Sequence, residues 1–284
     1  MLAAGDDARL IAGGQTLVPL MAMRLARPKR LIDIARITEL AFVRGEPDAV
    51  VVGATTKQCV LEHDPLIRAQ VPLLAKVMPF VGHAAIRARG TMGGSLANAD
   101  PAAEIALAAV ILDATIVYRD GDKDLKIRAS DFLTGPMMTV LSPTACLTCV
   151  RFPIWRETRM GVGFHEASAR RSDFAFASAG AQIALDGNGV CRRLSLGIGA
   201  VAGVPLRLGT LARALEGREE HAFEGGAAEQ SKLREAVAAA LAEIEPLSDL
   251  HASADYRRRA ATTLLLRAIA DAYRATKGRA IRAH

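Results

Sequence analysis

The chain has 284 residues, of which 51% are hydrophobic and 4% aromatic, and its net charge at pH 7 is +6. This length allows one large domain or two modest ones, with a core built mainly from Ala, Leu, Val and Ile. The 36 basic side chains are matched by 30 acidic ones and occur in short, scattered groups. Nucleic-acid-binding surfaces instead cluster Lys and Arg with stacking aromatics, so we expect no nucleic-acid partner.

The sequence indicates neither secretion nor membrane insertion. It begins without a basic-then-apolar signal pattern, and it contains no run of about eighteen uncharged apolar residues. Four cysteines in such a chain favour the reducing cytoplasm. Cys146 and Cys149 lie in an alternating, strand-like run, where residues three apart point to opposite faces. They have no second cysteine pair or nearby His, so we expect no metal site and interpret both as buried strand residues.

The first half of the chain alternates short strand-like and helical patterns. We expect strands at 9–12, 31–34, 50–54, 114–118 and 125–127, and helices at 71–80 and 103–112. Asp120-Gly121-Asp122 is a hairpin turn between the last two strands. Asp100-Pro101 is the expected N-cap and first-turn signal of the second helix, and we expect Thr55 to cap a helix that follows the third strand. The pattern predicts an α+β arrangement with a mixed sheet.

The pattern changes around residues 153–163. Three strands follow one another, at 164–166, 179–185 and 193–199, with a specific hairpin signal at Asp186-Gly187-Asn188-Gly189. Helices are expected at 209–215, 227–244 and 255–277, and the last has one apolar face formed by residues 261, 264, 265, 268, 269 and 272. We therefore predict two domains, comprising residues 1–154 and 155–284.

Two glycine-paired loops are the most informative feature of the sequence. They are Ala12-Gly13-Gly14-Gln15-Thr16-Leu17 and Arg89-Gly90-Thr91-Met92-Gly93-Gly94-Ser95. Glycine allows a positive φ and a close approach of the backbone to a ligand, and successive N–H groups in such a turn bind anions. One such loop by itself is as often only a strand-to-helix turn. Two of them, each with hydroxyl residues, suggest that both bind one diphosphate.

The residues around these loops resemble a known family. Residues 11–34 read IAGGQTLVPLMAMRLARPKRLIDI and residues 85–104 read AIRARGTMGGSLANADPAAE. Both resemble the FAD-binding medium subunit of the molybdenum hydroxylases, the family of carbon monoxide dehydrogenase and xanthine dehydrogenase. The resemblance continues through Asp131-Phe132, Leu141-Ser142-Pro143, Asp173-Phe174-Ala175 and 253–257. It implies a two-part FAD-binding domain of the PCMH (vanillyl-alcohol oxidase-like) type, followed by a smaller antiparallel sheet-plus-helices domain.

The resemblance also implies which residues hold FAD. The backbone of Ala12, Gly13, Gly14, Gln15 and Thr16 would wrap the diphosphate, with Leu17 opening the next helix. Thr91, Met92, Gly93, Gly94 and Ser95 would form the other half of the cradle. Asn98 and Asp100 would reach ribose or ribityl hydroxyls, and Gly53, Ala54 and Leu147 would present their main chain to the flavin.

Two further residues have alternative interpretations. Glu104 replaces an Asp that contacts the cofactor in relatives, and it is equally well explained as a first-turn acid that complements the helix dipole. His165 stands where some relatives have a Lys near the flavin ring, where a cation would stabilise the reduced flavin. A lone His between strand residues is more often structural.

The predicted function is electron transfer within a complex. The resemblance implies a molybdopterin-binding large subunit, a small subunit with 2Fe–2S clusters, and electron flow through FAD to NAD, a quinone or oxygen. The sequence shows neither Ser, His and Asp in the order of a catalytic triad nor a cluster of metal ligands. We therefore expect the cofactor to perform the chemistry. The alternatives are a stand-alone FAD oxidoreductase and a non-catalytic subunit that has lost FAD.

Two details qualify this prediction. Relatives carry a strand and most of a helix before the first loop, and Met1-Leu2-Ala3-Ala4-Gly5 looks like the tail of that helix, so we expect the preceding part to be missing. The stretch Gly197-Ile198-Gly199-Ala200-Val201-Ala202 superficially fits a dinucleotide fingerprint. That fingerprint requires a helix directly after the glycines, and Pro205 interrupts the segment, so we exclude an NAD site there.

Overall fold

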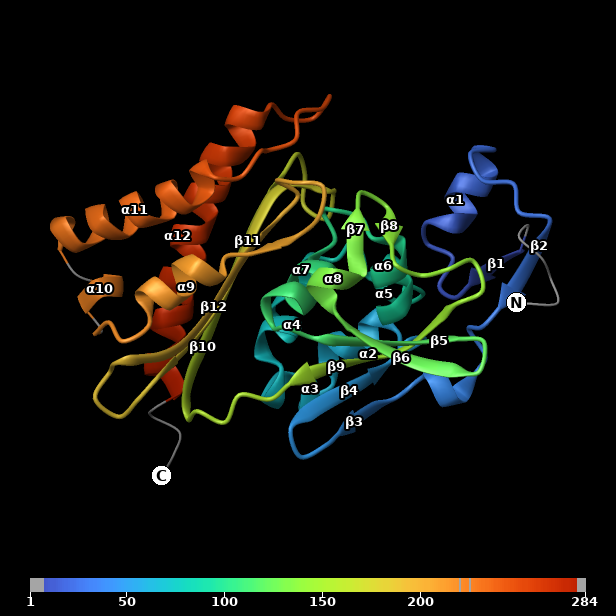
Figure 1. The fold of residues 1–284 in the computed structure, drawn as a ribbon, viewed down its shortest axis with the longest axis horizontal. Helices are drawn as coiled ribbons and strands as arrows, with labels where there is room; N and C mark the ends of the chain where they lie inside the picture. The colour runs from blue at the N-terminus through green and yellow to red at the C-terminus, as the bar shows by residue number, and fades with distance from the viewer. Residues whose placement is uncertain (1–7, 220, 225, 280–284) are drawn as a thin grey trace.

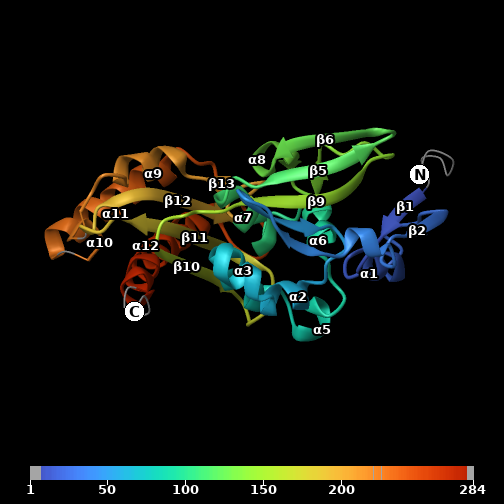
Figure 2. The same ribbon diagram turned by 90° about the horizontal axis from the view of Figure 1, so that it is seen from below.

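The computed structural model describes residues 8–219, 221–224 and 226–279, and the expected helix tail at Met1–Gly5 therefore lies outside the described residues. The molecule is elongated (Figure 1). A small N-terminal lobe lies at one end, a sheet with short helices lies in the middle, and a second sheet with long helices lies at the other end (Figures 1 and 2). No helix among the described residues is both long and apolar enough to cross a membrane.

The N-terminal lobe is a β-α-β unit. Strand β1 (Ala8–Ile11) pairs in parallel with β2 (Arg30–Asp33), and α1 (Leu17–Ala22) connects them. The chain turns between β1 and α1 at Gly14, whose φ is +72°. Glycine adopts this left-handed conformation without the steric cost of a Cβ atom. The first glycine loop is therefore the tight turn from strand to helix.

The middle part contains a five-stranded antiparallel sheet with the order β3-β4-β9-β5-β6. Its strands are β3 (Val43–Gly45), β4 (Ala49–Gly53), β5 (Thr115–Asp120), β6 (Lys123–Arg128) and β9 (Cys146–Pro153). A separate small hairpin consists of β7 (Leu133–Gly135) and β8 (Met138–Thr139). Among the described strands, parallel pairing is confined to β1 and β2, so the expected mixed sheet is wrong. Short hairpin turns join β3 to β4 and β5 to β6, and such turns impose antiparallel pairing.

Short helices connect these strands. They are η2 (Thr38–Leu40), α2 (Gln58–His63), α3 (Pro65–Gln70), α4 (Pro72–Val77), η3 (Met78–Phe80), α5 (Ala84–Arg87), α6 (Met92–Asn98), α7 (Glu104–Ile111) and α8 (Ala129–Phe132). The helix expected at 71–80 is present as α4 followed by one 3-10 turn, and the helix expected at 103–112 is α7.

Two of the expected helix caps are wrong. Helix α7 is preceded by Ala103, whereas the Asp100 carboxylate accepts a hydrogen bond of 2.9 Å from the Ala102 N–H in the preceding turn. Helix α2 begins after Lys57, and the buried Thr55 hydroxyl is directed toward the Ile37 carbonyl, 3.5 Å away. Asp100 and Thr55 each lie too far before the following helix to cap it. Each side chain instead interacts with a backbone group of a loop.

The C-terminal part is a four-stranded antiparallel sheet with helices. The strands, in the order in which they pair, are β10 (Arg159–Ser168), β11 (Ala175–Leu185), β12 (Cys191–Gly199) and β13 (Leu206–Arg207). The helices are α9 (Gly209–Leu215), α10 (His221–Glu224), α11 (Ala227–Ala242) and α12 (Ala254–Arg279). The predicted hairpin between β11 and β12 is confirmed: Gly189 has a φ of +83°, and the Asp186 carboxylate accepts bonds from the N–H groups of Asn188 and Val190.

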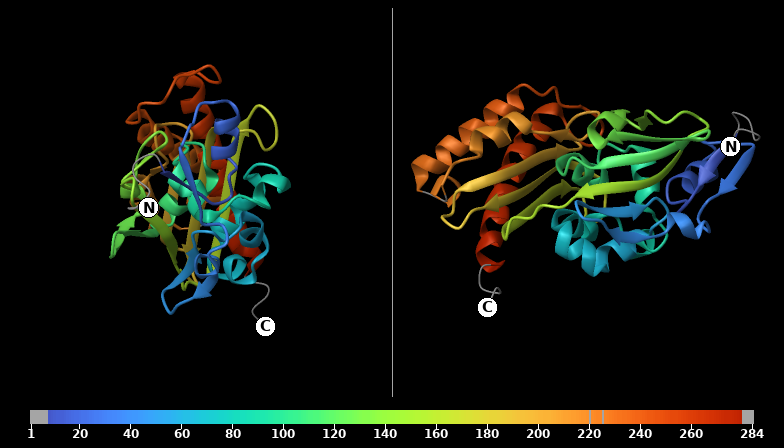
Figure 3. Two further views of the ribbon diagram at one scale, coloured as in Figure 1. Left: turned by 90° about the vertical axis from the view of Figure 1, so that its right-hand side faces the viewer. Right: turned by 60° about the horizontal axis from the view of Figure 1, so that its bottom comes forward.

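Helix α12 covers one face of this sheet, and strand alternation separates the two faces (Figures 1 and 3). Ala179, Ala181 and Ile183 of β11 pack with the apolar side of α12, whose residues 261, 264, 265, 268, 269 and 272 are all buried as predicted. Two glycines of β10 allow a close approach. A Cβ atom at Gly163 would lie 2.0 Å from the Ala268 carbonyl oxygen, and one at Gly161 would lie 1.9 Å from that of Ala272.

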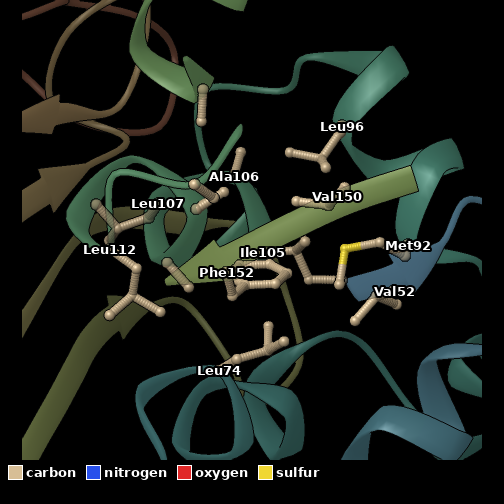
Figure 4. Close-up of a cluster of buried hydrophobic side chains, with 14 of the residues drawn as sticks. Val52, Leu74, Met92, Leu96, Ile105, Ala106, Leu107, Leu112, Val150 and Phe152 are labelled. Carbon is tan, nitrogen blue, oxygen red and sulfur yellow. The ribbon is translucent and has the colours of Figure 1, made fainter. Parts of the chain in front are cut away.

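Helix α7 packs against the other face of the same sheet. Its residues Ile105–Ile111 are all buried, and its side chains join those of the middle sheet in one core (Figure 4). Strand β12 has glycines at positions where α7 approaches it closely. A Cβ atom at Gly197 would lie 2.5 Å from Ile111 Cγ1, and one at Gly199 would lie 3.2 Å from Leu107 Cδ2. Glycines of the apparent dinucleotide fingerprint therefore serve helix packing.

We predict that Gly163→Ala lowers the free energy of unfolding by about 1–3 kcal/mol, because the new methyl group overlaps the Ala268 carbonyl and must displace α12. Urea unfolding followed by circular dichroism measures the effect. Gly187→Ala is the matched control, since nothing lies within 4 Å of the Cβ position in that hairpin turn. Equal stability of the two variants would contradict this account of the packing.

Candidate functional site

A cleft of about 760 Å³ lies between the N-terminal lobe and the helices of the middle part. Its volume is within the range of roughly 300–1,000 Å³ typical of cofactor sites. Its walls come from distant segments of the chain, namely 9–17, 81–83, 90–104, 145–147 and 172–174. Both glycine loops lie in these walls, so the fold brings together what the sequence separates by about eighty residues.

The first glycine loop offers free backbone donors. Among the described residues, the N–H groups of residues 13–16 donate to no backbone acceptor, whereas the Val18 N–H bonds the Gly14 carbonyl at 3.0 Å. The Gln15 side chain bonds back to the Gly13 carbonyl at 3.0 Å and stabilises the turn. Consecutive N–H groups without internal partners form an anion-binding concavity. This loop is therefore suited to bind a diphosphate.

The second glycine loop packs directly against the first and is satisfied internally. A Cβ atom at Gly13 would lie 2.4 Å from the Arg89 carbonyl oxygen, and one at Gly93 would lie 2.7 Å from Ala54 Cβ. The N–H of Gly93 bonds the Ala54 carbonyl at 2.8 Å, and the N–H of Gly94 bonds the Thr91 hydroxyl at 3.1 Å. Because these donors are used, the loop faces the cleft chiefly with the surface of Gly94 and the side chains of Ser95 and Asn98.

A buried ion pair supports the wall beside the second loop. Arg87 bonds both carboxylate oxygens of Glu62, at 2.8 and 3.1 Å, and also donates to the carbonyls of Val81 and Gly82, at 3.2 and 2.9 Å. Bidentate pairs of this kind have fixed geometry. The side chains are only 12% and 16% exposed, so the pair ties α2 to the segment that lines the cleft.

Most of the expected site residues line this cleft. They are Ala12, Gly13, Gly14, Gln15, Thr16, Leu17, Ala54, Thr91, Gly93, Gly94, Ser95, Asn98, Asp100, Glu104 and Leu147. Three expected residues lie elsewhere. Gly53 is a packing glycine, whose Cβ would lie 2.2 Å from the Leu40 carbonyl oxygen, and Met92 is fully buried in the core (Figure 4). His165 faces α12, where its Nε2 pairs with the Asp271 carboxylate at 2.8 Å.

The cleft also contains residues that sequence reasoning missed. These residues are Gln58, His83, Ile86, Met137, Leu141 and Cys146, together with Ser172, Asp173 and Phe174 from the segment just before β11. Of these residues, Ile86, Leu141, Asp173 and Phe174 lie in stretches that carried the family resemblance. Cys146 and Cys149 are free thiols, as expected, but both are only partly buried, and burial raises the pKa of each.

Two carboxyl groups near the cleft have strongly perturbed acidity. Burial raises the pKa of Glu104 to about 7, assisted by the charge of Asp100. Burial also raises the pKa of Glu166 to about 8, assisted by the charge of Glu104. No group of three or more His, Cys, Asp or Glu side chains among the described residues is arranged to hold a metal.

The residues present fit a flavin dinucleotide. Two glycine loops approach so closely that a methyl group would fill the space between them, and one loop offers N–H groups without backbone partners among the described residues. Apolar and polar side chains together line the rest of the cleft. Such a site is suited to a dinucleotide cofactor bound largely through backbone groups. The comparisons with known proteins specify which one.

Residues 1–155 match the family model described as the FAD binding domain in molybdopterin dehydrogenase, and residues 163–272 match that of the CO dehydrogenase flavoprotein C-terminal domain. The chain is 32% identical to the 6-hydroxypseudooxynicotine dehydrogenase complex subunit alpha of Paenarthrobacter nicotinovorans, over 94% of this chain and 88% of that protein. It is 31% identical to the carbon monoxide dehydrogenase medium chain of Hydrogenophaga pseudoflava, over 95% and 90%. The structure of quinoline 2-oxidoreductase from Pseudomonas putida 86 matches with a TM-score of 0.87 and 32% identity, covering 98% of this chain and 92% of that one. This chain therefore belongs to the family of FAD-binding subunits of molybdopterin dehydrogenases, the molybdenum hydroxylases, and it is an oxidoreductase subunit with FAD as its cofactor.

We predict that Gly13→Ala weakens FAD binding by at least about tenfold, because the methyl group forces the two loops apart. Quenching of flavin fluorescence during titration of the apoprotein measures the dissociation constant. Gly187→Ala controls for the loss of a surface glycine. Unchanged affinity in Gly13→Ala would show that the close approach of the loops is not needed for binding.

The raised pKa values of Glu104 and Glu166 predict a pH-dependent stability. A carboxyl group whose pKa is higher in the folded than in the unfolded protein stabilises the fold fully at pH values below its ordinary pKa of 4.5. This stabilisation is lost as the pH rises through the pKa of the folded state. Unfolding of the apoprotein by urea should therefore lose on the order of 2 kcal/mol between pH 6 and pH 9. The double variant Glu104→Gln, Glu166→Gln should show a flatter profile, and an equally steep one would refute the assignment.

The position of His165 predicts that it makes no contribution to cofactor binding. His165→Asn should leave FAD affinity unchanged while it weakens the link to Asp271 on α12. The same fluorescence titration tests the affinity, and thermal unfolding tests the link. A weaker affinity with unchanged stability would instead place His165 at the cofactor.

Proposed function

We propose that this chain is the electron-transfer subunit of a molybdopterin-dependent hydroxylase or dehydrogenase complex. It would receive electrons from the 2Fe–2S clusters of a small subunit and pass them through FAD to an external acceptor. A large subunit would hold molybdopterin and bind the organic substrate. The observation that carries this proposal is the cleft of about 760 Å³ in whose walls the two glycine loops lie together.

The residues of this chain would then bind and orient the cofactor. The free N–H groups of residues 13–16 would hold the diphosphate, while Ser95 and Asn98 would hydrogen-bond hydroxyl groups of FAD from the opposite wall. Leu147 and Ala145, at the start of β9, would face the ring with their main chain. FAD, when bound, supplies the redox chemistry, and the protein excludes water and fixes the position of the ring.

The relatives support a role within a complex. One is named as a complex subunit alpha and another as a medium chain, so both are parts of larger enzymes. We also propose that the chain divides at residues 154 and 155 into an FAD-binding part and a C-terminal part, and that the complex works in the cytoplasm. Support for the cytoplasm comes from the four cysteines, which are free thiols in this structure.

The decisive experiment is a visible absorption spectrum of the protein, purified alone and with co-purifying partners, before and after dithionite. We expect oxidised-flavin bands that bleach on reduction, and broad iron–sulfur absorption in the co-purified sample. A chain that binds flavin but never co-purifies with an iron–sulfur protein would contradict the electron-transfer role. A colourless protein that stays colourless after incubation with FAD would contradict flavin binding itself.

A further inference from the structure

Arg257 lies near the start of α12 and joins three separate segments of the chain. Its side chain is only 5% exposed. Nη1 donates to the carbonyls of Phe176, at 2.7 Å, and Ala200, at 2.6 Å, while Nη2 pairs with the Asp249 carboxylate at 2.6 Å. A guanidinium presents its donors in a rigid plane, so it fixes the relative positions of the groups that accept from it. Arg257 therefore holds the start of β11, the residue after β12 and the loop before α12 in one arrangement.

Asp249 in turn fixes the direction of the guanidinium. Its Oδ1 atom accepts hydrogen bonds from the N–H groups of His251 and Ala252, at 2.9 and 3.0 Å, which leaves Oδ2 for Arg257. The Asp249 side chain is 46% exposed, so backbone donors rather than burial hold it in place. The loop before α12 thus anchors the charged end of Arg257.

Both backbone segments that accept from Arg257 continue into the wall of the cleft. Residues 172–174, which lie just before β11 and Phe176, line the cleft directly. On the other side, the N–H of Ala200 donates to the Pro101 carbonyl at 2.8 Å, and both neighbours of Pro101 in the chain are lining residues. Arg257 is itself not among the lining residues. Two stretches of the wall therefore depend on a side chain outside the lining.

The wall contains backbone conformations that are costly for residues with a Cβ atom. Four of the six described non-glycine residues with a positive φ lie in or beside it, namely Ala99, Met137, Ser172 and Ala200. Such conformations persist only where surrounding contacts hold them, and they concentrate at functional sites. Ala200, with a φ of +60°, uses both of its backbone groups, since its N–H bonds Pro101 and its carbonyl bonds Arg257. The guanidinium therefore helps to hold Ala200 in the conformation in which it bonds Pro101.

We propose that Arg257 is a positioning residue for FAD. By holding Ala200 in its left-handed conformation, it places the wall around Pro101 and thereby sets the affinity of the cleft for the cofactor. The inference rests on the proposed function in one respect, because it requires FAD to occupy the cleft. Without the guanidinium, Ala200 relaxes toward a negative φ, its N–H turns away from Pro101, and the wall shifts. Reciprocally, bound FAD stabilises the same hydrogen bonds.

The dissociation constant of FAD for the full chain, measured by flavin fluorescence, tests the inference. Arg257→Met fills similar space without donors and should weaken FAD binding by about tenfold or more, because hydrogen bonds from a charged donor are lost. Arg258→Met is the matched control. Arg258 is the next residue of α12, and it donates at 3.0 Å to the Ile244 carbonyl, which lies outside the cleft lining. The FAD affinity of this control should stay within about twofold of the wild type.

A double variant tests the route through Ala200. Glycine adopts a positive φ without steric cost, so this turn would no longer need the guanidinium to hold it. Ala200→Gly alone should leave FAD affinity within about twofold of the wild type. The double variant Arg257→Met, Ala200→Gly should regain much of the affinity that Arg257→Met loses. A general loss of stability would not be reversed in this way, because glycine increases the conformational freedom of the unfolded chain.

Hydrogen exchange provides a readout in the apoprotein. The amide of Ala200 should exchange faster in Arg257→Met than in the wild type or in Arg258→Met, and added FAD should slow it in the wild type. Circular dichroism confirms that each variant is folded. If Arg257→Met does not fold, Asp249→Asn takes its place, because it keeps the Oδ1 acceptor and removes the charge opposite the guanidinium. It should weaken FAD binding by about threefold or more.

Wild-type FAD affinity in the folded Arg257→Met or Asp249→Asn protein would overturn this inference, and so would an equal loss of affinity in Arg258→Met. A double variant that binds FAD no better than Arg257→Met would overturn it as well, because the guanidinium would then act by a route other than Ala200. Failure of the wild-type chain to bind FAD would instead contradict the proposed function.

Discussion

Helix α7 must be shielded from water on every side, because its residues from Ile105 to Ile111 are all apolar and all buried. No single sheet can shield a helix that is apolar around its whole circumference. Helix α7 is therefore enclosed between the middle core and the faces of β11 and β12 (Figure 4). At its C-terminal end the Ser195 hydroxyl donates to the Ile111 carbonyl at 2.5 Å, which satisfies a group that burial would otherwise leave unpaired. The two halves of the chain meet on this helix.

The same helix determines where the cleft wall lies. Its first residue, Glu104, emerges into the cleft, and the preceding loop is anchored to the end of β12 by the bond from the Ala200 N–H to the Pro101 carbonyl, at 2.8 Å. The buried Arg257 of α12 donates in turn to the Ala200 carbonyl at 2.6 Å. A continuous series of hydrogen bonds thus connects the C-terminal helix to the cofactor wall. The acidity of Glu104 is a product of this arrangement, because the carboxyl is held at the margin of the core.

The sequence predicted the structure correctly where a residue type or its spacing indicates one particular backbone conformation. The turn at Gly14 and the hairpin at Asp186–Gly189 require specific backbone conformations, and the apolar face of α12 follows from simple helical spacing. It failed where a side chain depends on a partner distant in sequence. No local pattern predicts that His165 pairs with Asp271 on α12. Phe174 lies in a stretch that carries the family resemblance, but no local pattern predicts that it reaches a cleft built mainly from the first half of the chain. The glycines of β12 were predicted not to bind NAD, and only the structure shows that they accommodate α7.

The distribution of the cleft walls along the chain has a consequence for biosynthesis. The first glycine loop leaves the ribosome early, whereas residues 172–174 and the strands that enclose α7 follow only after more than half of the polypeptide has been made. Contacts between such distant segments form late and slowly, because closing a long loop costs conformational entropy. Until then α7 exposes an apolar surface that a nascent chain must protect, and the cofactor has no complete cleft to enter. The cleft is therefore complete only after residues 172–174 have been synthesised and have folded back onto the first half of the chain.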